Sequence, residues 1–188
     1  LMHMPVIDAA RLSKNQGEGF DFNSQYDGIR NFVKKADLAI INYEGTFARD
    51  IAEYASYPVF NGPDELVPAL KNAGFHVITT GNNHSNDYGK AGLVSTMDTI
   101  RNNGMEYVGT QFKKEEKILY KDIDGIKLAI ISATEHFNGT ETWLEEEDFE
   151  NMLNPLGDGE ELVENIKKAR KEGADIIIIY PHWGEEYA

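Results

Sequence analysis

Residues 63–80 read PDELVPALKNAGFHVITT, and this stretch predicts one helix followed by one buried strand. Pro63 suits the first turn of a helix, where its missing backbone N–H leaves nothing unsatisfied, and the acidic residues after it favour the positive end of the helix dipole. Leu66 and Leu70 lie four residues apart on one face, and Gly74 predicts the end of the helix. The apolar run after Gly74 predicts the strand. This unit indicates an α/β fold.

The flanking sequence repeats the alternation of helices and strands. Hydrophobic spacing predicts helices at 24–36, 93–104 and 160–171, and strands at 37–42, 107–108, 117–123, 126–132 and 175–180. Asp124-Gly125 separates two of these strands and is a strong hairpin signal. Residues 134–158 are expected to form an acidic loop, with Glu145 to Glu150 in solvent. The pattern predicts one layered α/β domain over residues 1–188, with a mixed sheet.

The last predicted strand contains four consecutive isoleucines, Ile176 to Ile179. A strand of this composition is expected to be covered on both faces and paired along both edges. Only eight residues follow Tyr180, and the chain begins with Leu1 instead of an initiator methionine. We therefore expect the domain to be truncated at one or both ends.

Composition excludes several classes of function. The chain has 188 residues, with 18 Lys and Arg against 32 Asp and Glu, which gives a formal net charge of −14. Such a surface repels the phosphates of nucleic acids, so we expect no nucleic-acid partner. The chain has no cysteine, which excludes disulfides, thiolate zinc sites and thiol nucleophiles. No apolar run is long enough to span a bilayer, and no signal peptide is visible.

Polar side chains follow three of the predicted strands at the points where those strands end. The carboxyl ends of strands in α/β sheets converge on a shared crevice, where ligands bind. Carboxylate, amide and imidazole groups without thiolate suit Mn, Fe, Zn or Mg. The candidate site residues at these strand ends are Asn42, Glu44, Asn82, Asn83, His84, Asp87, His182, Trp183, Glu185 and Glu186.

Each candidate also has a purely structural alternative. Asn42 could cap its strand, Glu44 could lie in solvent, and His182 could be a hydrogen-bonded core histidine beside Trp183. The loop at 81–87 differs, because three asparagines, a histidine and an aspartate between glycines make a poor core segment, and a plain turn does not need a histidine. Two other histidines, His76 in a strand and His136 in a loop, receive no functional role.

Three stretches resemble a known family. Residues 37–44, DLAIINYE, resemble the strand and Asn-Leu-Glu element of the bacterial capsule synthesis protein CapA family, which is associated with poly-γ-glutamate. Residues 80–89, TGNNHSNDYG, resemble its NNHxxDxG loop, and residues 179–187, IYPHWGEEY, resemble its HWGxEY element. That family is similar in fold to the calcineurin-like metallophosphatases. The resemblance therefore implies a layered α-β-β-α sandwich with mixed sheets and two metals at strand ends.

The resemblance also implies a role for each matching residue. Asn83 and His182 would be metal ligands, and His84 would donate a proton to the leaving group. Glu44 occupies the position of the bridging aspartate of the phosphatases, and a glutamate there leaves the bridging geometry open. Asp87 has no firm counterpart, and we expect it to orient His84.

Two elements of the family pattern are missing from the chain. The family opens with Gly-Asp, whose aspartate is a metal ligand, and Leu1-Met2-His3 resembles the family residues directly after that pair. The family also continues to further histidines beyond the point where this chain stops, at Ala188. We therefore expect an incomplete site for a divalent metal (Mn, Fe, Zn or Mg) that is unoccupied in this fragment. The residues expected to line it are His3, Asn42, Asn82, Trp183, Glu185 and Glu186.

The implied chemistry is metal-dependent hydrolysis or transfer at a phosphoester or amide of an anionic polymer, poly-γ-glutamate, or of its precursors. Cations would bridge the polymer to a protein of the same charge. Two alternatives remain open: a non-catalytic envelope component that binds or guides the polymer, and a metal-dependent phosphoesterase unrelated to capsule. The resemblance also implies an extracytoplasmic protein, anchored in the membrane through a segment not present in this chain, with other capsule-synthesis membrane proteins as partners.

Overall fold

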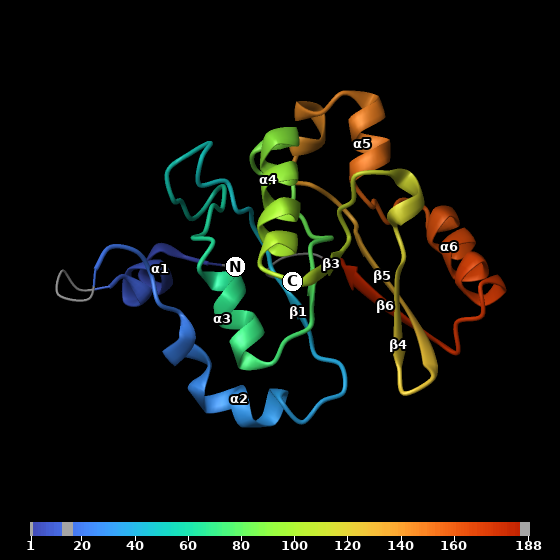
Figure 1. Cartoon of the computed structure of the whole chain (residues 1–188). Helices are drawn as coiled ribbons and strands as arrows, with labels where there is room; N and C mark the ends of the chain where they lie inside the picture. Colours follow the sequence, from blue (N-terminus) through green and yellow to red (C-terminus); the bar gives the residue numbers. More distant parts are fainter. Residues whose placement is uncertain (1, 13–16, 185–188) are drawn as a thin grey trace.

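The computed structural model describes residues 2–12 and 17–184, so the candidates Glu185 and Glu186 lie outside the described residues (Figure 1). The helices are α1 Met4–Ala10, α2 Asp27–Val33, α3 Leu66–Ala73, α4 Gly89–Asn102, α5 Glu146–Met152 and α6 Glu160–Lys171, with 3₁₀ turns η1 Asn23–Tyr26, η2 Lys114–Glu116 and η3 Thr140–Trp143. The strands are β1 Ile40–Asn42, β2 Val77–Thr79, β3 Glu106–Val108, β4 Leu119–Ile123, β5 Ile126–Thr134 and β6 Ile176–His182.

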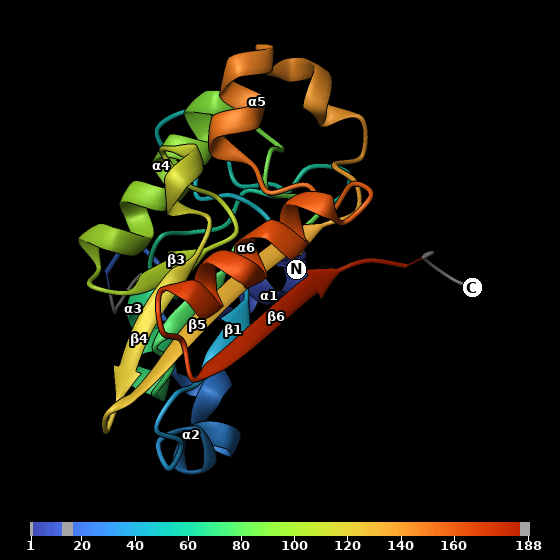
Figure 2. The same cartoon turned by 90° about the vertical axis from the view of Figure 1, so that its right-hand side faces the viewer.

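The strands form two sheets that lie between helices. The first sheet has the order β1-β2-β3 and is parallel throughout. The second has the order β4-β5-β6, in which β4 is antiparallel and β6 parallel to β5. Figures 1 and 2 show α3 on the outer side of the first sheet and α6 on the outer side of the second. The layers therefore run helix, sheet, sheet, helix.

Side-chain alternation along β5 explains how the second sheet is buried on both faces. Ile130 is buried against Val77 and Val108 of the first sheet. Its neighbours Ala129 and Ile131 point the other way and pack against α6. Because successive side chains of a strand alternate between faces, one apolar run covers both sides of the sheet.

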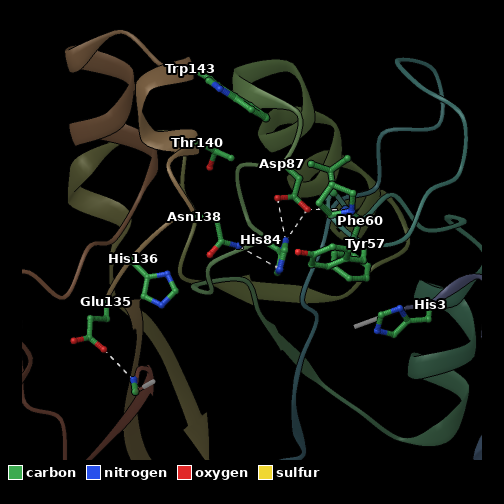
Figure 3. Close-up of a pocket in the computed structure, with 13 residues that line it drawn as sticks. His3, Tyr57, Phe60, His84, Asp87, Glu135, His136, Asn138, Thr140 and Trp143 are labelled. Carbon is green, nitrogen blue, oxygen red and sulfur yellow. Dashed lines mark hydrogen bonds and ion pairs between the residues drawn. The ribbon is translucent and has the colours of Figure 1, made fainter. Parts of the chain in front are cut away.

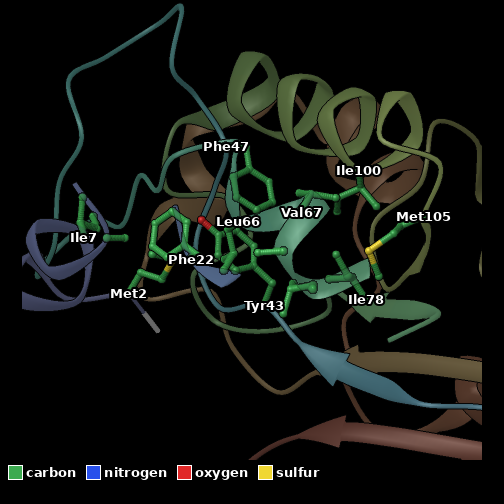
Figure 4. Close-up of a cluster of buried hydrophobic side chains, with 13 residues drawn as sticks. Met2, Ile7, Phe22, Tyr43, Phe47, Leu66, Val67, Ile78, Ile100 and Met105 are labelled. Carbon is green, nitrogen blue, oxygen red and sulfur yellow. The ribbon is translucent and has the colours of Figure 1, made fainter. Parts of the chain in front are cut away.

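A larger apolar cluster fills the space between the first sheet and the helices around α3 (Figure 4). Tyr43, which follows β1, stacks on Phe47 with ring centroids 4.1 Å apart. Burial raises the pKa of the Tyr43 hydroxyl, which donates to the Thr46 carbonyl at 2.9 Å. This cluster fixes the chain immediately after β1, where the candidate residue Glu44 lies.

Several predicted elements are confirmed. The helix at residues 160–171 and the hairpin around Asp124-Gly125 are both present. Gly74 ends α3 with φ of 107°, a left-handed conformation that glycine adopts without steric cost.

The expected acidic loop at 134–158 is wrong, because this segment contains η3 and α5. The run Glu145 to Glu150, expected in a solvated loop, lies largely in α5. Glu146, Glu147 and Asp148 are in the first turn of the helix, where the dipole favours them. Met152 is buried against Leu93 and Met97 of α4, and this packing stabilises the helix.

Two of the predicted elements are notably exposed. The predicted helix at 24–36 is shorter, and Phe32 on its apolar face is 82% exposed. Among the described residues β6 pairs only with β5, and Ile176 and Ile179 are 47% and 40% exposed, so these residues do not supply the cover and the second paired edge that the apolar composition of the strand calls for. No helix in the described part of the chain is long and apolar enough to cross a membrane.

Candidate functional site

The loop that follows β2 contains the polar residues of the candidate site. Asn82, Asn83, His84 and Asp87 are all buried, at 0%, 1%, 7% and 2% relative exposure. Asn82 fixes the start of the loop, because its Nδ2 donates to the Tyr43 carbonyl at 2.8 Å and its Oδ1 accepts from the His84 backbone N–H at 3.1 Å. Buried polar groups need such partners. The loop is thus tied to the end of β1.

A close approach of two glycines sets the position of this loop. A Cβ on Gly109, which follows β3, would lie 2.2 Å from the Gly81 backbone nitrogen. A Cβ on Gly81 would in turn lie 2.7 Å from Ser132 Oγ on β5. Since no side chain fits at either position, glycines let the ends of β2, β3 and β5 meet.

His84 and Asp87 form a buried pair (Figure 3). His84 Nδ1 lies 2.9 Å from Asp87 Oδ2 and 3.1 Å from Oδ1. Asp87 Oδ2 also accepts the Phe60 backbone N–H at 2.6 Å, and the Phe60 ring packs edge-on against the imidazole at 4.7 Å. The contact that the orienting role of Asp87 requires is therefore present.

The other ring nitrogen of His84 faces an amide. Asn138 Nδ2 lies 3.3 Å from His84 Nε2, and Asn83 Nδ2 donates to Asn138 Oδ1 at 3.3 Å. Asn83 Oδ1 is buried and has no hydrogen-bond partner among the described residues. An amide oxygen in this state is suited to bind a cation, because burial without a partner is costly.

A second pair of candidates meets across the two sheets. His182, at the end of β6, has its Nε2 3.9 Å from Oε1 of Glu44, which follows β1. Asn42 Nδ2 donates to Glu44 Oε2 at 3.5 Å and Asn42 Oδ1 accepts from Asn82 Nδ2 at 3.2 Å. Asn42 therefore links this pair to the loop.

The donor types fit a divalent metal, and the set is incomplete within the described residues. Asn83 Oδ1, the Glu44 carboxylate and the His182 imidazole are ligands that Zn, Mn or Mg accept. However, the described part of the chain contains no group of three or more His, Asp or Glu side chains arranged to hold a metal ion.

A pocket of about 1340 Å³ lies above the His84–Asp87 pair (Figure 3). Of the predicted site residues described by the structure, His3, His84 and Asp87 line it, whereas Glu44, Asn83 and His182 do not. The predicted residue Trp183 is 70% exposed and does not line the pocket either. Within the described part of the chain the lining residues are His3, Tyr57, Pro58, Val59, Phe60, His84, Asp87, Glu135, His136, Asn138, Thr140, Trp143 and Gly184.

Sequence reasoning missed both walls of this pocket. One wall is the segment around Phe60, and the other is the segment from Glu135 to Trp143. The loop that follows β2, residues 81–88 (the motif loop), holds both walls. The Asp87 carboxylate accepts from the Phe60 N–H, and Asn86 Nδ2 donates to the Thr140 carbonyl at 2.6 Å. Asn138-Gly139 was the available signal, because this pair favours positive φ and therefore a tight turn.

Comparison with known proteins places these observations in a family. The profile of the bacterial capsule synthesis protein family PGA_cap matches residues 1–188. The chain belongs to this family. Capsule biosynthesis protein CapA from Bacillus anthracis is 33% identical over 129 residues, which cover 66% of this chain and 30% of that protein. PGA biosynthesis protein CapA from Bacillus subtilis (strain 168) is 29% identical over 179 residues, which cover 90% of this chain and 44% of that protein.

Solved structures confirm the metallophosphatase-like fold of this capsule-synthesis chain. A protein described as a 5'-nucleotidase from Staphylococcus aureus, in complex with alpha-ketoglutarate, matches 95% of this chain and 35% of its own with a TM-score of 0.53 at 18% identity. The NAD nucleotidase of Haemophilus influenzae matches 88% of this chain over 32% of its own length, with a TM-score of 0.55 at 16% identity. The chain spans less than half the length of the two CapA relatives.

Proposed function

We propose that this chain is the catalytic part of a capsule-synthesis protein, acting on a phosphoester or amide bond of an anionic polymer such as poly-γ-glutamate, or of a precursor of that polymer. The His84–Asp87 pair at the floor of the pocket carries the proposal. A buried imidazole that is held by a carboxylate on one nitrogen and lines a pocket is an arrangement suited to proton transfer.

In this proposal His84 moves a proton at Nε2. Asp87 accepts from Nδ1 and so fixes the ring orientation, and the proton is exchanged at Nε2, where a molecule in the pocket would replace the contact with Asn138 Nδ2 at 3.3 Å. The Phe60 ring covers one side of the imidazole and excludes water there. A positioned acid or base of this kind contributes about 10²–10⁴-fold to rate.

We further propose that Asn83, Glu44 and His182 hold a divalent cation (Mn, Fe, Zn or Mg), together with donors outside the described residues. When bound, such a cation supplies Lewis acidity toward the bond under attack. The unpartnered Asn83 oxygen and the Glu44–His182 contact support this part of the proposal. The cation would also attract a polyanion to a protein whose formal net charge is −14.

Family membership in capsule synthesis is the observation that supports the proposed setting. We place the protein outside the cytoplasmic membrane, anchored through a segment that this chain does not contain, with other capsule-synthesis membrane proteins as partners. A second candidate function is a non-catalytic envelope component that binds or guides the polymer. The pocket volume of about 1340 Å³ favours that candidate, since it exceeds the usual range for a single small ligand, about 300–1,000 Å³.

The test uses the whole protein with Mn²⁺ and three substrates: a simple phosphodiester, poly-γ-glutamate and a nucleoside monophosphate. The proposal predicts metal-dependent cleavage of one of the first two, lowered about 10²–10⁴-fold by His84→Ala with polymer affinity unchanged. His76→Ala is the matched control, because this exposed histidine lies outside the pocket and accepts the Ala39 N–H. Polymer binding without turnover would favour the second candidate, and cleavage of the nucleotide alone would indicate a phosphoesterase unrelated to capsule.

A further inference from the structure

Four side chains around His84 form a chain of hydrogen bonds whose directions depend on one another. Asn83 Nδ2 donates to Asn138 Oδ1 at 3.3 Å, and Asn138 Nδ2 lies 3.3 Å from His84 Nε2. His84 Nδ1 lies 2.9 Å from Asp87 Oδ2. A carboxylate only accepts hydrogen bonds, so Nδ1 must carry the proton in this contact. For a neutral imidazole, each later direction follows from this one.

In a neutral imidazole with the proton on Nδ1, Nε2 presents a lone pair. Asn138 must then turn its amide nitrogen toward Nε2, which turns its oxygen toward Asn83. Asn83 must in turn present its own amide nitrogen to that oxygen, which turns Asn83 Oδ1 away from the network. This is the buried oxygen that has no partner. Reversing Asn83 alone would bring two amide oxygens together and bury an unpaired N–H group.

The backbone around Asn138 is built to hold the amide in this place. Asn138 has φ of 55° and Gly139 has φ of 83°, a left-handed turn that Asn and Gly adopt more readily than other residues. Thr140 closes the turn through its N–H and Oγ1, which both donate to the Phe137 carbonyl at 2.9 and 2.6 Å. Asn86 Nδ2 binds the Thr140 carbonyl at 2.6 Å, which fixes the turn against the motif loop.

We propose that Asn138 is a positioning residue whose Oδ1 orients Asn83, so that Asn83 Oδ1 is presented to a cation, and that the His84–Asp87 pair sets the orientation of the Asn138 amide. This inference rests on the proposed metal site. The side chain reaches His84 from the opposite wall of the pocket (Figure 3). Asn138 would act through Asn83, without binding the cation itself. Outer groups that orient a metal ligand typically contribute 10–100-fold to metal affinity.

The test compares two substitutions in the whole protein. Asn138→Gly removes the side chain and suits the positive φ, so the turn is retained. Asn138→Asp keeps an acceptor for Asn83 Nδ2 and removes the donor to His84. Thr142→Ala is the control, because this exposed side chain in the same segment only donates to the Gly139 carbonyl.

The first readout needs no metal: hydrogen exchange of the Asn83 side-chain amide, followed by NMR after selective ¹⁵N-asparagine labelling. We expect exchange to be at least about tenfold faster in Asn138→Gly and unchanged in Asn138→Asp and Thr142→Ala. The second readout is Mn²⁺ affinity by calorimetry, expected to fall about 10–100-fold in Asn138→Gly. Asn138→Asp should bind Mn²⁺ at least as tightly as the unmodified protein.

Unchanged Asn83 exchange in Asn138→Gly would overturn the positioning role. Loss of protection in Asn138→Asp would overturn it as well, since the acceptor is still present, and this variant decides the matter if Asn138→Gly does not fold. Unaltered Mn²⁺ affinity in a folded Asn138→Gly would show that Asn138 does not act on a cation site. If the unmodified protein binds no Mn²⁺ while Asn83 exchange changes as expected, the proposed metal site fails and the hydrogen-bond chain remains.

Discussion

Asp87→Ala is the substitution that most directly probes how the motif loop supports the pocket. The Asp87 carboxylate is 2% exposed and accepts from two donors, the Phe60 N–H at 2.6 Å and His84 Nδ1 at 2.9 Å. Removing the acceptor leaves both donors buried and unpaired, which costs about 1–3 kcal/mol for each. We therefore expect the free energy of unfolding to fall by about 2–6 kcal/mol at neutral pH.

The assay is urea unfolding at pH 7, followed by circular dichroism and by tryptophan fluorescence. Asp148→Ala is the matched control, because Asp148 pairs with Lys90 at 2.7 Å on the surface. Surface ion pairs contribute about 0–1 kcal/mol, so this variant should remain close to the unmodified protein. If Asp87→Ala and Asp148→Ala lose the same free energy within about 0.5 kcal/mol, the carboxylate does not hold the loop and the wall together.

Three further substitutions test other parts of the structure. Gly109→Ala should lower the free energy of unfolding by more than about 3 kcal/mol or prevent folding, because its Cβ would lie 2.2 Å from the Gly81 backbone nitrogen. Gly125→Ala is the control in the same urea titration, because no described atom lies within 4 Å of its Cβ. It should lower the free energy of unfolding only by the cost of the positive φ, about 1–2 kcal/mol. Tyr43→Phe should cost about 0.5–1.5 kcal/mol at pH 8. Burial raises the pKa of the Tyr43 hydroxyl, so above pH 10 this tyrosine ionises in the unfolded chain before it ionises in the folded protein. The unmodified protein then loses stability that the phenylalanine variant keeps, and the difference between their urea midpoints should shrink from pH 8 to pH 10.5. A constant difference would contradict this. Glu161→Gln should lower the melting temperature more than Lys117→Met does, because it leaves the buried Lys117 ammonium without the carboxylate that it contacts at 2.9 Å. Equal decreases in melting temperature would show that an unpaired Lys117 ammonium is not what destabilises the protein.

The elements that sequence predicts well are those with a local physical signal. Helix α6 has a strong apolar face, the hairpin has Asp124-Gly125, and α3 has a glycine at its end. Helix α5 gave no such signal, because its acidic residues read as solvated and its two apolar contacts, Phe149 and Met152, are made with α4 and with Phe137 far away in the sequence. Strand β6 could be identified from its four isoleucines, whereas the neighbours that would cover it and pair with its second edge leave no local signal in the sequence.

The candidate site shows the same division. The loop containing Asn83, His84 and Asp87 could be identified because its polar composition conflicts with its place after an apolar strand. Asn138 could not, since its role depends on the packing of a segment 54 residues away from His84. A single sequence does not reveal which distant turn closes a pocket, although the Asn-Gly pair predicts that a turn exists.

The proposed function requires that the loop after β2 and the Glu44–His182 pair form one divalent-metal site beside His84. The most direct measurement is an anomalous difference map at the zinc edge, from crystals of the whole protein grown with Zn²⁺. We predict a peak about 2.0–2.2 Å from Asn83 Oδ1, with Glu44 or His182 also coordinated. A protein that binds zinc in solution but shows its peaks only elsewhere, with Asn83 Oδ1 left uncoordinated, would contradict the account.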